Sequence, residues 1–181
     1  MKFLIATFLY LLILPCAHAQ EITIPDSINP PADHTLILTT HAKGYQIYQC
    51  RLQDGQYHWQ LTGPDATLFN EQGTLVGSHF IGPKWFYRDN SIVAGRLIQK
   101  FTAPHHSAIP WLLVKGINHQ GTGLFNTVSF INRMNTQGGI KPSTGCNSNH
   151  LGSERAIAYQ ADYLFYSKIT TSKRARKERS L

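Results

Sequence analysis

Hydrophobic and polar residues alternate with a period of two from residue 56 to residue 62, so that three large apolar side chains share one face. This alternation is typical of a half-buried β-strand. Residues 44–50 repeat the pattern with aromatic and β-branched side chains. Asp54-Gly55 lies between the two segments, and both residues tolerate the positive φ of a tight turn. The pattern therefore predicts a β-hairpin from Tyr45 to Thr62.

Turn residues predict two more hairpins, one around Gly73 and one around Asp89-Asn90. Gly63-Pro64 and residues 116–123 also have the composition of a turn or loop. No segment shows a sustained helical period with caps. Further strands are expected at residues 36–40, 66–69, 75–80, 84–88, 92–98, 111–115, 124–133 and 156–166. The sequence predicts an all-β, single-domain sandwich or barrel of short, mostly antiparallel strands. Residues 111–115 are apolar on both faces, which indicates a central position in the sheet.

The first 19 residues have the features of a signal peptide: Lys2, then an apolar run, then the small-residue cleavage site Ala17-His18-Ala19. The apolar run is too short for a membrane span. Lipid attachment at Cys16 is the alternative, and the preceding Pro15 disfavours it. We therefore expect a signal peptide at residues 1–19, an extended N-terminal arm at 20–33, the all-β domain at 34–167, and a basic, disordered tail at 168–181.

The net charge of +7 is concentrated near the C-terminus, where residues 173–179 carry five basic side chains and one acidic side chain. The rest of the mature chain is close to neutral, which argues against a specific nucleic-acid partner. Two interpretations stay open for the tail. It is either a solvated end, which is the more common case, or a segment that touches an anionic membrane or envelope polymer.

Removal of the signal peptide leaves two cysteines, Cys50 and Cys146. Pairing is the default in an oxidising compartment such as the periplasm or the extracellular space. We therefore expect a disulfide, and the alternative is two separately buried thiols. The bridge would close a loop of about 100 residues, for which the chain-entropy model gives a stabilisation of roughly 4–5 kcal/mol.

A set of short segments between about Pro30 and Tyr166 comprises residues 44–50, Trp59, and residues 64–69, 76–80, 82–85, 108–113, 133–136, 138–139, 145–146 and 159–166. As a set they resemble a family of bacterial and fungal secreted proteins, the domain of unknown function 3455 (DUF3455). The resemblance implies no established activity. Asn90 stands where the family has glycine, and it preserves the turn because Asn also tolerates positive φ. His105-His106 stand where the family tends to have an acidic residue, which argues against a shared function resting on those histidines.

Eight histidines lie outside the signal peptide, and none has the spacing of metalloprotease or zinc-finger ligands. We therefore expect no metal and no cofactor. The sequence contains no nucleophile elbow and no phosphate-binding glycine loop. A carboxylate pair for glycoside cleavage would have to come from Asp65, Glu154 and Asp162, and the sequence does not give their separation. Enzymatic activity is therefore unsupported but open, with no catalytic residue assigned.

His79 lies on a predicted strand, on the face opposite Phe80, where a polar ring can reach a pocket. Each of the three tryptophans either fills the core or offers a surface on which a ligand can stack. Arg133 ends an apolar strand and needs a partner, for which Asp162 and Glu154 are candidates. The candidate ligand-binding residues are His79, Trp85, Trp111, Arg133, Asn135 and Thr136.

These features favour an exported, non-catalytic module of the periplasm or extracellular space that binds a small ligand, a glycan or an envelope component. Two alternatives stay open. The first is an envelope-active hydrolase or lyase in which His79 acts with an acidic residue. The second is a structural or docking module that the basic tail recruits to an anionic surface. No transmembrane segment is expected in either case.

Overall fold

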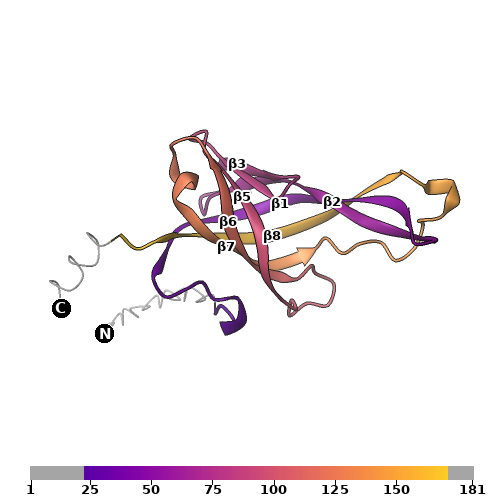
Figure 1. The fold of residues 1–181 in the computed structure, drawn as a ribbon, viewed down its shortest axis with the longest axis horizontal. Coiled ribbons are helices and arrows are strands. Elements are labelled where there is room, and N and C mark those ends of the chain that lie inside the picture. Colours follow the sequence, from indigo (N-terminus) through magenta and orange to yellow (C-terminus); the bar gives the residue numbers. More distant parts are fainter. Residues whose placement is uncertain (1–22, 171–181) are drawn as a thin grey trace, which may run out of the picture.

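The computed structural model of the protein describes residues 23–170, in which eight antiparallel strands close into one barrel (Figure 1). The strands are β1 (His34–Gln53), β2 (Gln56–Phe69), β3 (Leu75–Phe80), β4 (Lys84–Tyr87), β5 (Ile92–Phe101), β6 (Trp111–Gln120), β7 (Val128–Gly138) and β8 (Glu154–Lys168). Each strand pairs with its neighbours in sequence, and β8 pairs with β1. The predicted all-β, single-domain fold is confirmed, and its closure identifies a barrel. The predicted signal peptide and residues 171–181 of the tail lie outside the described residues.

β1 and β2 form the longest hairpin, and its turn lies where the sequence predicts it. Gln53 pairs with Gln56 across Asp54 and Gly55, whose φ values are 51° and 75°. The two strands expected within residues 36–50 are one continuous strand in the structure. Its continuity follows from pairing with β2 on one side and with β8 on the other.

Two turns predicted from composition are wrong. Gly63-Pro64 lies inside β2, next to a break in register between Ile47 and Tyr48 of β1. A bulge absorbs such a pair of residues without ending the strand. Most of the loop expected at residues 116–123 belongs to β6, which pairs with β5 as far as Gln120. In both places pairing with neighbouring strands outweighs the local preference of glycine and proline.

The first part of β6 is covered on both faces, in agreement with the two-sided apolar pattern of residues 111–115. Val114 belongs to the barrel core, whereas Leu113 packs outside the barrel against Ile28. Ile28 is fully buried and belongs to the short 3-10 helix η1 (Asp26–Ile28). The Asn132 amide fixes this segment by donating to the Ile28 carbonyl at 2.8 Å. The N-terminal segment therefore supplies the second hydrophobic layer over this side of the sheet.

One end of the barrel, which we call the closed end, is sealed by the 3-10 helix η2 (Leu124–Thr127). Phe125 of this helix is fully buried. Its ring stacks on Phe165 with centroids 4.5 Å apart and lies 5.2 Å from the ring of Tyr87. Aromatic pairs at these separations add to the free energy gained from burial. The closed end is therefore filled by side chains.

The polar groups around η2 are paired with one another. The backbone N–H of Leu124 donates to the Asp89 carboxylate at 2.6 Å, and the N–H of Phe125 donates to the Ser91 hydroxyl at 3.0 Å. Burial raises the pKa of Asp89, but hydrogen bonds from Ser91 and Leu124 outweigh it, so the pKa lies below the ordinary value of 3.8. This network fixes the helix that closes the barrel.

Beyond the other end of the barrel, the β1–β2 hairpin extends beside the loop between β7 and β8, which contains the 3-10 helix η3 (Ser148–His150) (Figure 1). A disulfide links Cys50 of β1 to Cys146 of this loop, with Cα atoms 5.3 Å apart, and confirms the predicted pairing. Trp59 packs beside it and donates from Nε1 to the Thr144 carbonyl at 2.8 Å. No helix among residues 23–170 is both long and apolar enough to cross a membrane.

Candidate functional site

A cavity of about 520 Å³ lies at the barrel end that carries the β3–β4 and β5–β6 connections. We call it the open-end cavity, because η2 seals the opposite end. All eight strands contribute to its wall, which is mostly apolar. The lining includes Gln46, Leu61, His79, Ile81, Trp85, Leu97, Lys100, Ile109, Leu112, Val114, Arg133 and Tyr163.

His79 points into the open-end cavity because its register partners, Ala66 and Trp85, belong to the barrel core. Its ring stacks on the Trp85 indole, with centroids 4.3 Å and planes 7° apart. His79 Nδ1 donates to the Lys84 carbonyl at 2.9 Å, so Nε2 carries the lone pair. Burial lowers the pKa of His79 to about 3; the Lys84 hydrogen bond opposes this shift, and the Arg133 charge adds to it. The ring is therefore a neutral hydrogen-bond acceptor.

Trp85 and its neighbours form a closely packed wall. A Cβ atom at Gly95 would lie only 2.8 Å from Cζ3 of the indole, so the absence of a side chain there makes room for the ring. The Tyr163 ring meets His79 and Trp85 edge-on, with centroids 5.0 Å and 5.6 Å away. These contacts hold the three rings in one arrangement and give the cavity a preformed surface.

Two buried donors in this wall have no hydrogen-bond partner among the described residues, Gln46 Nε2 and Trp85 Nε1. Both side chains are only 2% exposed. Burial raises the pKa of Tyr159, and a hydrogen-bonding contact from the Gln46 side chain opposes this rise, but the geometry of that contact leaves the Gln46 amide nitrogen without a full hydrogen bond. A buried donor without a partner costs about 1–3 kcal/mol of stability. Native structures contain few such groups, and an ordered water, an ion or a ligand can pair them.

Arg133 reaches the open-end cavity from β7. Its Nε and Nη2 donate to the Pro110 carbonyl at 3.1 Å and 2.9 Å. No carboxylate within residues 23–170 lies at ion-pair distance from this guanidinium. The sequence suggested Asp162 or Glu154 as the partner, but Asp162 contacts His41 on the outer surface instead. The described residues therefore do not neutralise the charge of Arg133.

The structure brings together three of the six predicted candidates, His79, Trp85 and Arg133. The other three lie outside the open-end cavity. Trp111 belongs to the outer cluster that covers β6, and Thr136 is buried with its hydroxyl donating to the Ile109 carbonyl. Asn135 follows Arg133 by two residues, but a break in register between Met134 and Gln137 turns it outward. Simple alternation along β7 could not have indicated this change of face.

Sequence reasoning missed Gln46 and Tyr163 as cavity residues. Gln46 lies two residues after Gly44 and two before Tyr48 on β1, so the three residues share one face of the strand. A glutamine on the interior face of a strand is the signal that could have identified it. Tyr163 is buried on β8, and the alternation of this strand indicates a core position but no cavity.

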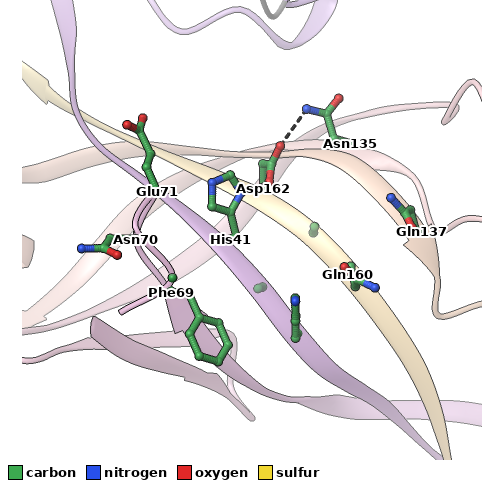
Figure 2. Close-up of a pocket in the computed structure, with 12 residues that line it drawn as sticks. His41, Phe69, Asn70, Glu71, Asn135, Gln137, Gln160 and Asp162 are labelled. Atoms are coloured by element: carbon green, nitrogen blue, oxygen red, sulfur yellow. Dashed lines mark hydrogen bonds and ion pairs between the residues drawn. The ribbon is translucent and has the colours of Figure 1, made fainter. Parts of the chain in front are cut away.

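A second cleft, of about 410 Å³, lies on the outside of the barrel beside the β2–β3 turn. Figure 2 shows His41 and Asp162 close together in it, with Asn135 reaching Asp162 from β7. His41 Nδ1 lies 2.6 Å from Asp162 Oδ1, and the Asn135 amide donates to Oδ2 at 2.7 Å. We call this set the outer triad.

The outer triad is explained by the fold. His41 and Asp162 are direct register partners on β1 and β8, and Asn135 has a φ of 48° at the bulge in β7. Both carboxylate oxygens are engaged, so they hold the bulge in place. No serine, threonine, cysteine or tyrosine lines the cleft to act as a nucleophile. No group of three or more His, Cys, Asp or Glu side chains within residues 23–170 could hold a metal ion. The open-end cavity is the stronger candidate.

Comparison with known proteins identifies a family whose function is unknown. The family model described as "Protein of unknown function (DUF3455)" matches residues 31–167. The matched range begins just before β1 and ends one residue before the end of β8, so it includes the whole wall of the open-end cavity. No curated protein and no solved structure matches the chain.

Proposed function

The chain belongs to the DUF3455 family, and we propose that it is a non-catalytic module that binds a small ligand in the open-end cavity. The observation that carries this proposal is the pair of buried donors, Gln46 Nε2 and Trp85 Nε1, that have no partner among the described residues. Each destabilises the folded chain unless an acceptor meets it. A bound ligand can supply acceptors, and both side chains line the cavity.

The size and lining of the cavity support the same function. Eight-stranded barrels have an interior that is either filled by side chains or able to hold one small ligand. The volume of about 520 Å³ falls within the usual range for small-molecule sites, which is roughly 300–1,000 Å³. A mostly apolar wall with a few polar groups is also typical of such sites.

A hydrolase or lyase that uses His79 with an acidic residue is less well supported. No aspartate or glutamate is among the residues that line the cavity. A general base works best when its pKa lies near the working pH, and the pKa of His79 is lowered to about 3. The same neutral ring is well suited to accept a hydrogen bond from a ligand.

Export to the periplasm or the extracellular space is part of this proposal. The Cys50–Cys146 disulfide supports it, because disulfides persist in oxidising compartments. The signal peptide expected at residues 1–19 would direct the chain there.

Filling the cavity tests the proposed function. Leu112 lines the open-end cavity, whereas Leu75 is 62% exposed and does not line it, so Leu112→Trp and Leu75→Trp form a matched pair. The probe is N-phenyl-1-naphthylamine, a neutral apolar dye that fluoresces when it leaves water. We expect saturable one-to-one binding by the unsubstituted protein, an affinity reduced about tenfold or more in Leu112→Trp, and a change below about twofold in Leu75→Trp.

Circular dichroism spectra and unfolding midpoints of both variants control for loss of the fold. Binding by folded Leu112→Trp that is as tight as in the unsubstituted protein would show that the dye occupies another surface. That result would overturn the open-end cavity as the binding site.

A further inference from the structure

The charges around the open-end cavity all have one sign. Arg133 and Lys100 contribute to its lining, and no acidic residue does. The guanidinium of Arg133 is half-buried and forms no ion pair with the described carboxylates. Its charge acts on the surrounding rings: burial raises the pKa of Tyr163, and Arg133 opposes this rise. A cation without an ion-pair partner is stabilised by an anion that binds beside it.

We propose that the ligand of the open-end cavity is an apolar molecule that ends in a single carboxylate. This inference rests on the proposed function and names its ligand class. The carboxylate oxygens would accept hydrogen bonds from the Arg133 guanidinium, which forms the shortest and strongest hydrogen bonds with such groups. The amide of Gln46 and the indole of Trp85 are the further donors without partners in this wall.

His79 limits the negative charge of the ligand. Its Nδ1 hydrogen is taken by the Lys84 carbonyl, so the side of the ring toward the cavity offers a lone pair. A second anionic group placed there would meet this lone pair and be repelled, whereas a hydroxyl group could donate to it. Arg133 is also the one half-buried cation of the lining, since Lys100 is exposed. One negative charge therefore matches the site.

The rest of the wall suits a hydrocarbon body. Ile109, Leu112 and Val114 line the cavity near Arg133. Toward its mouth, Leu61, Ile81 and Leu97 are 48%, 61% and 44% exposed, so the apolar surface continues to the rim. Burial of apolar ligand surface contributes about 25 cal/mol per Å². A glycan would leave most of its hydroxyl groups without partners on such a wall, at a cost in free energy for each.

Three probes of equal chain length separate charge from hydrophobicity: decanoate, methyl decanoate and decylammonium. Each displaces N-phenyl-1-naphthylamine from the protein near pH 7.5, below its micelle concentration. We expect the affinity for decanoate to exceed that for methyl decanoate by about tenfold or more, and the affinity for decylammonium to be the lowest of the three. Arg133→Gln should lower the affinity for decanoate to that of methyl decanoate, without changing the affinity for methyl decanoate.

Two further variants keep the test decisive. Arg133→Lys retains the charge and should retain the preference for decanoate, even where packing around the longer guanidinium is disturbed. Arg96→Gln removes an exposed cation that does not line the cavity and should leave all three affinities unchanged. A preference for decanoate that falls equally in Arg133→Gln and Arg96→Gln would reflect the overall charge of the protein and would overturn the assignment.

Two other outcomes separate this inference from the proposed function. Equal affinity for the three probes, abolished by Leu112→Trp, would overturn the carboxylate class and leave binding in the cavity intact. Failure of the folded protein to bind N-phenyl-1-naphthylamine or any of the three probes would overturn both proposals.

Discussion

The two ends of the barrel are built from the same eight strands, but their polar groups differ in how they are paired. At the closed end, the carboxylate of Asp89 and the hydroxyl of Ser91 meet the backbone N–H groups of η2. At the open end, buried donors on Gln46 and Trp85 and the charge of Arg133 lack such partners among the described residues. Asp89 and Ser91 therefore satisfy the polar groups of η2, whereas the buried donors of Gln46 and Trp85 have no such partners among residues 23–170.

Aromatic packing shows the same contrast. The closed end stacks Phe125 on Phe165, and both rings are hydrocarbon. The open end stacks His79 on Trp85 in a similar way, but each of these rings carries nitrogen atoms that form hydrogen bonds. Groups that destabilise the chain and persist in a well-packed wall are expected where they serve binding. This contrast predicts that the closed end contributes most to the stability of the barrel, and that the open end binds the ligand of the proposed function.

Removal of the aromatic seal gives the largest expected effect. Phe125→Ala deletes a fully buried ring that contacts Phe165 and Tyr87. Truncation of a buried phenylalanine to alanine lowers the free energy of unfolding by about 3–5 kcal/mol, because it removes burial and leaves a cavity. Urea denaturation followed by circular dichroism measures this loss.

The matched substitution at the open end is Leu97→Ala. Leu97 lines the mouth of the cavity but is 44% exposed, so its truncation should change stability by less than about 0.5 kcal/mol. Similar losses for Phe125→Ala and Leu97→Ala would contradict the assignment of stability to the closed end.

Acid should weaken the open end through His79. The folded pKa of about 3 lies below the unfolded value of 6.5, so the unfolded chain binds the proton more tightly. The full stability is present above pH 6.5 and is lost as the pH falls toward 3, at about 1.4 kcal/mol per pH unit. Between about pH 7 and pH 4.5 this amounts to roughly 2–3 kcal/mol.

The variant that isolates this effect is His79→Asn, which keeps a donor for the Lys84 carbonyl and does not titrate. Its unfolding free energy should fall less with acid than that of the unsubstituted protein, by the amount given above. Parallel pH profiles for the two proteins would show that His79 is readily protonated in the fold. That result would contradict the assignment of His79 as a neutral hydrogen-bond acceptor in the cavity wall.

The sequence predicted the all-β fold better than the site, and particular residues show why. Turn residues such as Asp54-Gly55 act locally, so the predicted hairpins were correct. Only two cysteines follow the expected signal peptide, and the oxidising compartment was enough to predict that Cys50 pairs with Cys146. The site depends on contacts across the barrel. Gln46 on β1 and Arg133 on β7 meet one cavity only because β8 lies between those strands and pairs with both. No local pattern carries that information, and the bulge that turns Asn135 outward is also set by pairing.

The smallest expected effect has the opposite sign. Gln46→Leu replaces a buried amide whose nitrogen has no partner with an apolar side chain of similar size, and it should raise the free energy of unfolding by about 1–2 kcal/mol. The same change should weaken decanoate binding, because the ligand loses a donor. Gln99→Leu, at an exposed position on β5, is the control and should stay within about 0.5 kcal/mol. A loss of stability in Gln46→Leu would mean that the chain itself satisfies this amide, and the contrast between the two ends would then rest on Trp85 and Arg133 alone.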